Sequence, residues 1–214
     1  DNSVELVVSE WACLVSGMVW VALNVRSSAS EQAAILRDCT PSVLIVASRY
    51  RGLVDAGALG VGCAIVEVGD SGQWESLLAA GEPRLPVQSP GAEDVVRIRY
   101  TSGTAGLPKG AVLPRRCYDA SVEVVADVIG PLRACDVLAQ VAPMTHAAGA
   151  MWLPHAVVGA TALLIDRFDA AGFLDLVERE GVTSAFLVPT MLVRFLEAFG
   201  TAPRTTSLRS VVYG

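Results

Sequence analysis

Short apolar runs alternate with helix-like stretches along the whole sequence, and this alternation constrains the fold more than any other feature. The clearest helix-like stretches are 116–129 and 172–180. Strands and helices that alternate with short turns predict the α/β class, with a doubly wound, mostly parallel sheet and helices on both faces. A hydrophobic content of 52% and a mean hydropathy of +0.48 fit buried parallel strands. The expected strands are 19–24, 43–47, 64–68, 95–100, 137–142, 161–165, 183–188 and 208–213.

A proline-rich segment divides the chain. Residues 81–93 contain three prolines and predict a linker between an N-terminal α/β part, 1–92, and a second α/β part, 93–214. In the first part, Ser30 is the expected N-cap of a helix at 31–39.

Charge and cysteine usage exclude several classes of protein. The net charge of -6 argues against a nucleic-acid surface, and no stretch offers the roughly 18 unbroken apolar residues of a membrane span. The five cysteines are widely spaced, so we expect reduced core residues of a cytoplasmic protein rather than a disulfide or metal framework. They are Cys13, Cys39, Cys63, Cys117 and Cys135.

The only lysine among the 16 Lys and Arg residues, Lys109, lies in the glycine-rich segment YTSGTAGLPKG at 100–110. A compact ammonium group reaches between phosphate oxygens where a planar guanidinium does not fit. Glycines let the backbone approach a ligand, and hydroxyl groups donate to it. The segment therefore predicts a nucleoside triphosphate site. Its other members are Gly103, Gly106 and Gly110, and the hydroxyl residues Thr101, Ser102 and Thr104.

This loop is not a Walker A loop, because Gly110 stands where that pattern needs Ser or Thr to hold magnesium. It instead resembles the S/T-S-G-T-T-G-x-P-K-G segment of the adenylate-forming superfamily, which includes acyl-CoA synthetases, peptide-synthetase adenylation domains and luciferases. Two departures weaken individual contacts. Ala105 replaces a hydroxyl residue, and Arg115 stands where the family often has a histidine.

Other segments extend the resemblance over essentially the whole chain. Asn24 and the pair Thr145–His146 favour the acyl-CoA or aryl-CoA ligase branch over peptide-synthetase domains. The matching segments are GMVWVALNVR at 17–26, VAPMTHAAG at 141–149, FLVPTM at 186–191 and LRSVVYG at 208–214.

The resemblance implies a fragment of an ATP-dependent acid–thiol ligase. Such an enzyme uses ATP with Mg²⁺ to convert a small-molecule carboxylic acid into an acyl adenylate, and coenzyme A, the co-substrate, then takes the acyl group. His146 would gate or line the passage between nucleotide and acyl group, whereas His155 has no motif and is expected to be structural. The implied acyl-pocket residues are His146, Gly149, Pro189, Tyr213 and Gly214.

Two other functions fit the same sequence: a non-catalytic nucleotide-binding or scaffold module, and an adenylation domain that loads a carrier protein. We expect Thr101, the 143–146 turn, Pro189 and Gly214 to meet at one sheet edge.

The resemblance also implies that the family's C-terminal catalytic domain is absent, so we expect no certain catalytic residue here and an inactive isolated chain. The cut strand at 208–213 would expose an edge through which copies pair or aggregate.

Overall fold

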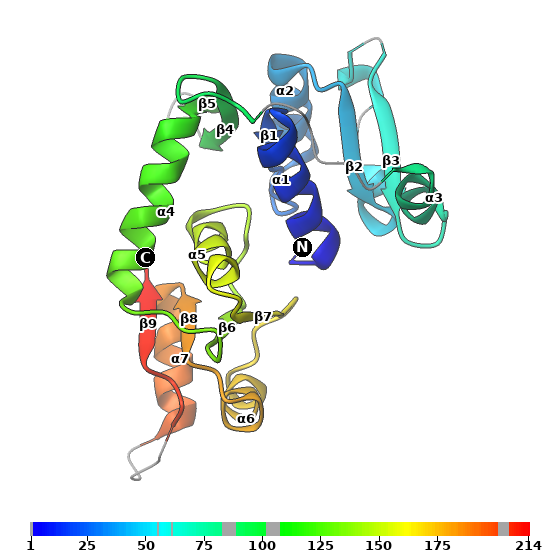
Figure 1. Ribbon diagram of the computed structural model, residues 1–214. Helices are drawn as coiled ribbons and strands as arrows, with labels where there is room; N and C mark the ends of the chain where they lie inside the picture. Colours follow the sequence, from blue (N-terminus) through cyan, green and yellow to red (C-terminus); the bar gives the residue numbers. More distant parts are fainter. Residues whose placement is uncertain (1, 55, 61, 83–88, 102–107, 201–205) are drawn as a thin grey trace. The chain divides into compact units, whose positions relative to one another are not determined.

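The computed structural model describes residues 2–54, 56–60, 62–82, 89–101, 108–200 and 206–214. The chain forms two compact units (Figure 1). The discontinuous unit contains Asp1–Val7 and Arg116–Gly214, and the continuous unit contains Val8–Arg115. The boundary at 92/93 stays a prediction. Across the described ranges, no helix combines the length and apolar character that a bilayer crossing requires.

The continuous unit holds two small sheets. One has the order β1–β4–β5, with β1 (Trp20–Val21) parallel and β5 (Lys109–Pro114) antiparallel to β4 (Val95–Thr101). The other is the parallel pair of β2 (Val43–Ala47) and β3 (Ala64–Val68). The helical elements are α1 (Val4–Ser16, whose first turn belongs to the discontinuous unit), α2 (Ala29–Cys39), η1 (Ser48–Leu53), η2 (Ala56–Ala58) and α3 (Gln73–Ala80).

Helix α2 starts one residue before Ser30, so the predicted N-cap is wrong. Ser28 is the cap: its Oγ accepts from the Glu31 N–H at 3.3 Å, and the Glu31 carboxylate accepts from the Ser28 N–H at 2.9 Å. This reciprocal pair satisfies two backbone donors, because Glu31 lies three residues after Ser28. Three residues after Ser30 comes Ala33, which has no side-chain acceptor for such a pair.

The discontinuous unit is built on a four-stranded parallel sheet with the order β7–β6–β8–β9. Its strands are β6 (Val137–Gln140), β7 (Thr161–Leu164), β8 (Ser184–Leu187) and β9 (Ser210–Tyr213). Its helical elements are α4 (Arg115–Ile129), η3 (Ala147–Ala150), α5 (Trp152–Val157), α6 (Ala170–Glu180) and α7 (Pro189–Phe199).

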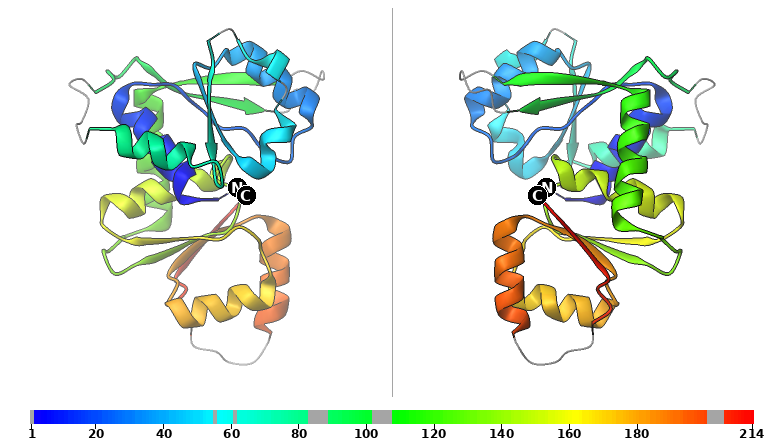
Figure 2. Two further views of the ribbon diagram at one scale, coloured as in Figure 1. Left: turned by 90° about the vertical axis from the view of Figure 1, so that its right-hand side faces the viewer. Right: turned by 90° about the vertical axis from the view of Figure 1, so that its left-hand side faces the viewer.

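Each face of this sheet is covered by its own apolar cluster. Ala139, Ala185 and Leu187 point to the face where α6 and α7 pack, through Phe173 and Phe195. The alternate residues of the strands, Leu138 and Phe186, point to the other face, where α4 and α5 pack. The two views of Figure 2 show these helices on opposite sides of the sheet. The doubly wound α/β prediction is therefore confirmed.

The strand order creates a switch in the direction of the crossovers. From β6 the chain passes through α5 to β7 on one side, and from β8 it passes through α7 to β9 on the other. In open α/β sheets, ligands bind outside the carboxyl ends of the strands at such a switch point. Here that point lies between the carboxyl ends of β6 and β8.

The structure corrects two further predictions. The four predicted strand ends do not share one edge, because Thr101 ends β4 in a different sheet, whereas the other three follow β6, β8 and β9. The cysteines are free thiols, as predicted, but they are not core residues. Four are half-buried and Cys135 is exposed.

Candidate functional site

The lysine-bearing loop joins the two strands of the β4–β5 hairpin. Thr101 and Lys109 face each other as the last paired residues of that hairpin, and both are exposed. Two of the six predicted phosphate-binding residues are thereby placed at the mouth of the loop. The other four, Ser102, Gly103, Thr104 and Gly106, lie outside the described residues.

Gly110, which follows the lysine, makes room for an aromatic ring. A Cβ atom at this position would lie 2.8 Å from Cγ2 of Ile98 and 3.0 Å from Cζ of Tyr100. The Tyr100 hydroxyl donates a hydrogen bond to the Asp38 carboxylate on α2. Burial, and then this hydrogen bond, raise the pKa of Tyr100, so the phenol stays protonated. Gly110 therefore lets the side chains of Ile98 and Tyr100 pack against the hairpin backbone. Its place in the sequence instead suggested a role in ligand binding.

A buried ion pair also anchors the base of the hairpin. Nη1 of Arg97 on β4 lies 2.9 Å from Oε1 of Glu10 on α1, and both side chains are at most 3% exposed. Arg97 precedes Thr101 by four residues on the same strand. The strand that enters the loop is thus fixed to α1 by a charged hydrogen bond out of contact with water.

The turn after β6 carries His146 and depends on Gly149. The His146 N–H donates to the Pro143 carbonyl at 3.2 Å, and the His146 carbonyl accepts from the Gly149 N–H at 3.0 Å. A Cβ atom on Gly149 would lie 2.0 Å from the Met144 carbonyl oxygen. Backbone atoms cannot move aside as a flexible side chain can, so only glycine fits.

Replacing Gly149 with alanine should destabilise the protein by roughly 1–3 kcal/mol, because the new methyl group overlaps the Met144 carbonyl. Urea denaturation measures this loss. Gly52→Ala is the matched control, since nothing lies within 4 Å of its Cβ position. Equal midpoints for the two variants would contradict the steric argument.

The other predicted acyl-pocket residues follow the neighbouring strands. Pro189 is the first residue of α7, directly after β8 and Val188, and it is exposed. Tyr213 ends β9 and is 68% exposed, and Gly214 follows it. His146 and Pro189 therefore follow the two strands that flank the switch point. Gly149 is buried and shapes the turn, and Met151 and Trp152 belong to the core.

Sequence analysis missed Asn2, which lies at the carboxyl ends of β6 and β7. Its side chain makes four hydrogen bonds, to the backbone of Gln140, Ala142, Met144 and Ile165. Locally, the sequence shows only that Asn2 is a polar residue next to Ser3. Ser3 caps α1, because its Oγ accepts from the Leu6 N–H at 3.2 Å.

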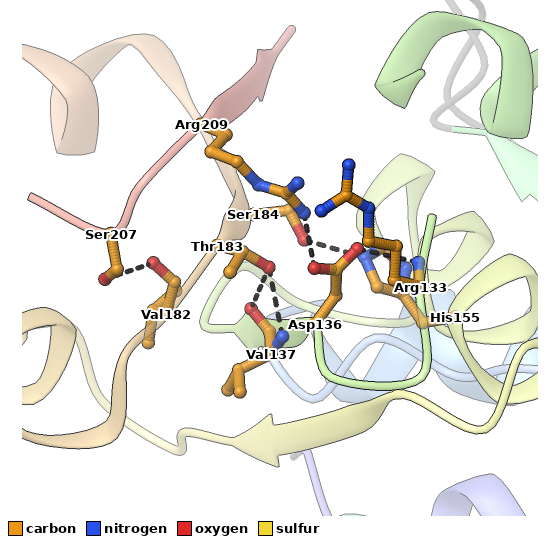
Figure 3. Close-up of polar contacts among 9 residues, drawn as sticks. All are labelled: Arg133, Asp136, Val137, His155, Val182, Thr183, Ser184, Ser207 and Arg209. Atoms are coloured by element: carbon orange, nitrogen blue, oxygen red, sulfur yellow. Dashed lines mark hydrogen bonds and ion pairs between the residues drawn. The ribbon is translucent and has the colours of Figure 1, made fainter. Parts of the chain in front are cut away.

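A second polar cluster lies at the opposite, amino-terminal edge of the sheet (Figure 3). Asp136, just before β6, accepts from the Arg133 N–H at 2.8 Å and from the Arg209 guanidinium. Burial alone would raise the pKa of Asp136, but the hydrogen bonds and charges of both arginines outweigh it and lower that pKa. The cluster ties the starts of β6 and β9 together and lies away from the ligand edge.

His155 and Ser184 form a buried pair in the same cluster. Nδ1 of His155 lies 2.7 Å from the Met151 carbonyl oxygen, and Nε2 lies 2.7 Å from Ser184 Oγ. A carbonyl oxygen only accepts, so Nδ1 carries the proton and Nε2 accepts from the serine hydroxyl. The two residues are 0% and 2% exposed. Both ring nitrogens are satisfied without substrate, which fits the structural role expected for His155.

The stability of the protein should fall in mild acid because of His155. Burial lowers the pKa of His155 from 6.5, and the Met151 carbonyl and the Asp136 charge offset this only in part. The unfolded chain therefore binds this proton more readily, and the free energy of unfolding decreases as the pH drops below about 6.5, by at most about 1.4 kcal/mol per pH unit. Urea midpoints between pH 7.5 and 5.5 should depend less steeply on pH in His155→Gln. Parallel curves would contradict this assignment.

No group of three or more His, Cys, Asp or Glu residues that could hold a metal ion is found within the described ranges. The structure instead combines a doubly wound sheet with a lysine-bearing loop that closes an antiparallel hairpin. This defines an α/β protein distinct from the Walker class, in which the loop leads from a strand into a helix. The chain belongs to the AMP-binding enzyme family, whose model matches residues 1–214.

Individual relatives agree with this family. A feruloyl-CoA synthase from Amycolatopsis sp is 36% identical over 217 residues, 95% of this chain and 40% of the relative. A fatty acid–[acyl-carrier-protein] ligase, ScoC, from Streptomyces coeruleorubidus is 31% identical over 211 residues, again 95% and 40%. The chain thus spans about 40% of the length of these curated relatives.

A solved structure of ATP-bound MatB from Rhodopseudomonas palustris has a TM-score of 0.82 and 25% identity, covering 99% of this chain and 42% of that chain. The resemblance to the adenylate-forming superfamily is confirmed, and with it the fold of the large domain of acyl-CoA synthetases.

Proposed function

We propose that the complete protein is an ATP-dependent acid–thiol ligase acting on a small-molecule carboxylic acid. The acid's carboxylate attacks the α-phosphorus of Mg–ATP, pyrophosphate leaves, and an acyl adenylate forms. The thiol of coenzyme A then attacks the acyl carbon, and AMP leaves. The observation that carries the proposal is the position of Lys109, opposite Thr101 at the mouth of a glycine-rich loop, in a chain of the AMP-binding family.

In this proposal Lys109 and the loop hold the phosphates of ATP. The exposed ammonium group at the start of β5 neutralises the charge that grows on the leaving pyrophosphate. Thr101, Ser102, Gly103, Thr104 and Gly106 supply hydroxyl and backbone donors. Mg²⁺ enters with ATP as part of the substrate.

In this proposal the acid substrate binds at the carboxyl ends of the strands in the discontinuous unit. His146 borders the passage between the acyl group and the nucleotide, and Pro189, Tyr213 and Gly214 line the acyl pocket with the Gly149 turn. The switch point between β6 and β8 supports this assignment, because such points bind ligands in open α/β sheets. The chain's own residues therefore bind and orient the two substrates.

Acid-dependent ATP–pyrophosphate exchange by the complete protein tests the proposal. The exchange is measured with a panel of hydroxycinnamic, aryl-acetic and fatty acids. A second assay then measures thioester formation on coenzyme A. Exchange with at least one acid, and thioester formation on CoA, are expected. No exchange with any acid, despite ATP binding, would contradict the ligase and favour a non-catalytic nucleotide-binding module.

A carrier protein is the second candidate acceptor, and the relative ScoC, named as an acyl-carrier-protein ligase, favours it. The two acceptors are separated by offering the adenylate CoA or a phosphopantetheinylated carrier. A cytoplasmic location fits the supply of ATP and CoA. Pairing or aggregation of the isolated chain through β9 stays a prediction, which light scattering over a concentration series tests.

A further inference from the structure

The Asn2 side chain bonds to backbone groups at the end of β6, in the turn that follows it and at the end of β7. Nδ2 lies 2.9 Å from the Gln140 carbonyl oxygen and 3.1 Å from those of Ala142 and Ile165. Oδ1 accepts from the Met144 N–H at 3.0 Å. Only the amide nitrogen can face three carbonyl oxygens, so these contacts fix the orientation of the group.

These bonds begin where the strand ladder ends. The pairing of β6 with β7 stops at Gln140 and Leu164, and the Ile165 N–H makes the last backbone bond, to the Gln140 carbonyl at 3.0 Å. Beyond this point the chain leaves β6 toward the turn. Asn2 adds a second donor to the Gln140 carbonyl, and it bonds to the Ala142 and Ile165 carbonyls and the Met144 N–H, which lie beyond the last paired residues of β6 and β7.

The same contacts fix the path of the chain to His146. The Met144 N–H is bonded to Asn2, and the Met144 carbonyl oxygen lies against Gly149. His146 is two residues further on, and its N–H is tied back to Pro143. Losing the Asn2 contacts should therefore shift the start of the turn, while β6 keeps its backbone pairing with β7 and β8.

We propose that Asn2 is a positioning residue for the His146 turn, holding it in the geometry that acyl adenylate formation requires. The inference rests on the proposed ligase function. It assigns a role in the reaction to a residue that none of the sequence motifs identified.

The test compares Asn2→Ala and Asn2→Asp with the neighbouring variant Ser3→Ala in the complete protein. Asn2→Ala removes all four bonds, whereas Asn2→Asp keeps the acceptor for Met144 and loses the donors. Ser3→Ala removes only the bond to the Leu6 N–H, which caps α1. Pyrophosphate release is measured at varied acid and ATP, and hydrogen exchange is followed in residues 141–149 and 184–187.

Both Asn2 variants should lower kcat/KM for the acid by roughly 10 to 100-fold, the scale of a reacting group misplaced by about 1 Å. The KM for ATP should stay within about twofold, because the phosphate loop lies on the β4–β5 hairpin. Ser3→Ala should retain wild-type kinetics. Exchange should become faster in 141–149 but not in 184–187.

Several results would overturn the proposal. These are Asn2 variants with the kinetics of Ser3→Ala, unchanged exchange in 141–149, or loss of folding in both Asn2 variants, which would make Asn2 a stability residue only. If the wild-type protein activates no acid, the ligase proposal fails separately. The exchange comparison alone then decides whether Asn2 holds the turn.

Discussion

Lys109→Ala in the complete protein should lower the rate of adenylate formation by roughly 10 to 1000-fold, the cost of removing one preorganised electrostatic stabiliser. Lys109 is exposed and pairs across the hairpin through its backbone, so its side chain adds little to stability. The unfolding midpoint should therefore stay close to that of the wild type. Pyrophosphate release at saturating acid and ATP gives the rate.

Lys109→Arg is the matched control, because it keeps the charge and changes only its shape. A planar guanidinium does not fit between phosphate oxygens as an ammonium group does, so this variant should also be impaired. Full activity in Lys109→Arg would remove the argument from the only lysine in the chain. Full activity in Lys109→Ala would contradict the assignment of Lys109 to a phosphate-binding site.

Removing one partner of the Arg97–Glu10 pair should cost about 3–5 kcal/mol of stability, because the other charge stays buried without its ion-pair partner. Glu10→Ala and Arg97→Ala are followed by denaturant titration. The double variant Glu10→Leu/Arg97→Met replaces the pair with apolar side chains and should lose much less than the single variants.

The surface pair Arg179–Glu180 provides the control. Its side chains are 66% and 41% exposed, so Arg179→Ala should change stability by no more than about 0.5 kcal/mol. If the double variant at Glu10 and Arg97 lost as much as either single one, packing rather than an uncompensated charge would explain the effect.

Much of the fold could be predicted because its signals are local. The apolar runs at 137–142 and 183–188 contain β6 and β8, and the loop sequence at 100–110 was enough to suggest the family. Strand β5 was not predicted. Its sequence, KGAVLP, begins beside a glycine and ends in proline, and it becomes a strand by pairing with β4.

The contacts that hold the candidate site together could not be predicted in the same way. Asn2 bonds to residues between 138 and 163 positions away, and Asp136 bonds to Arg209, 73 positions away. No pattern within a short window of sequence carries such contacts. Gly149 was identified through a motif, but its physical reason, the approach of the Met144 carbonyl, required the structure.

The division of the chain into units also sets an order for folding during synthesis. The continuous unit, Val8–Arg115, is complete when residue 115 has left the ribosome, whereas Asn2 must wait for β6, β7 and Ile165. At about 5–20 residues per second this wait is on the order of 10 s. Residues 2–7 therefore leave the ribosome well before the partners that they bond to. A nascent chain halted at about residue 155, so that residue 115 has cleared the exit tunnel, should protect the continuous unit from protease while residues 2–7 stay open to cleavage.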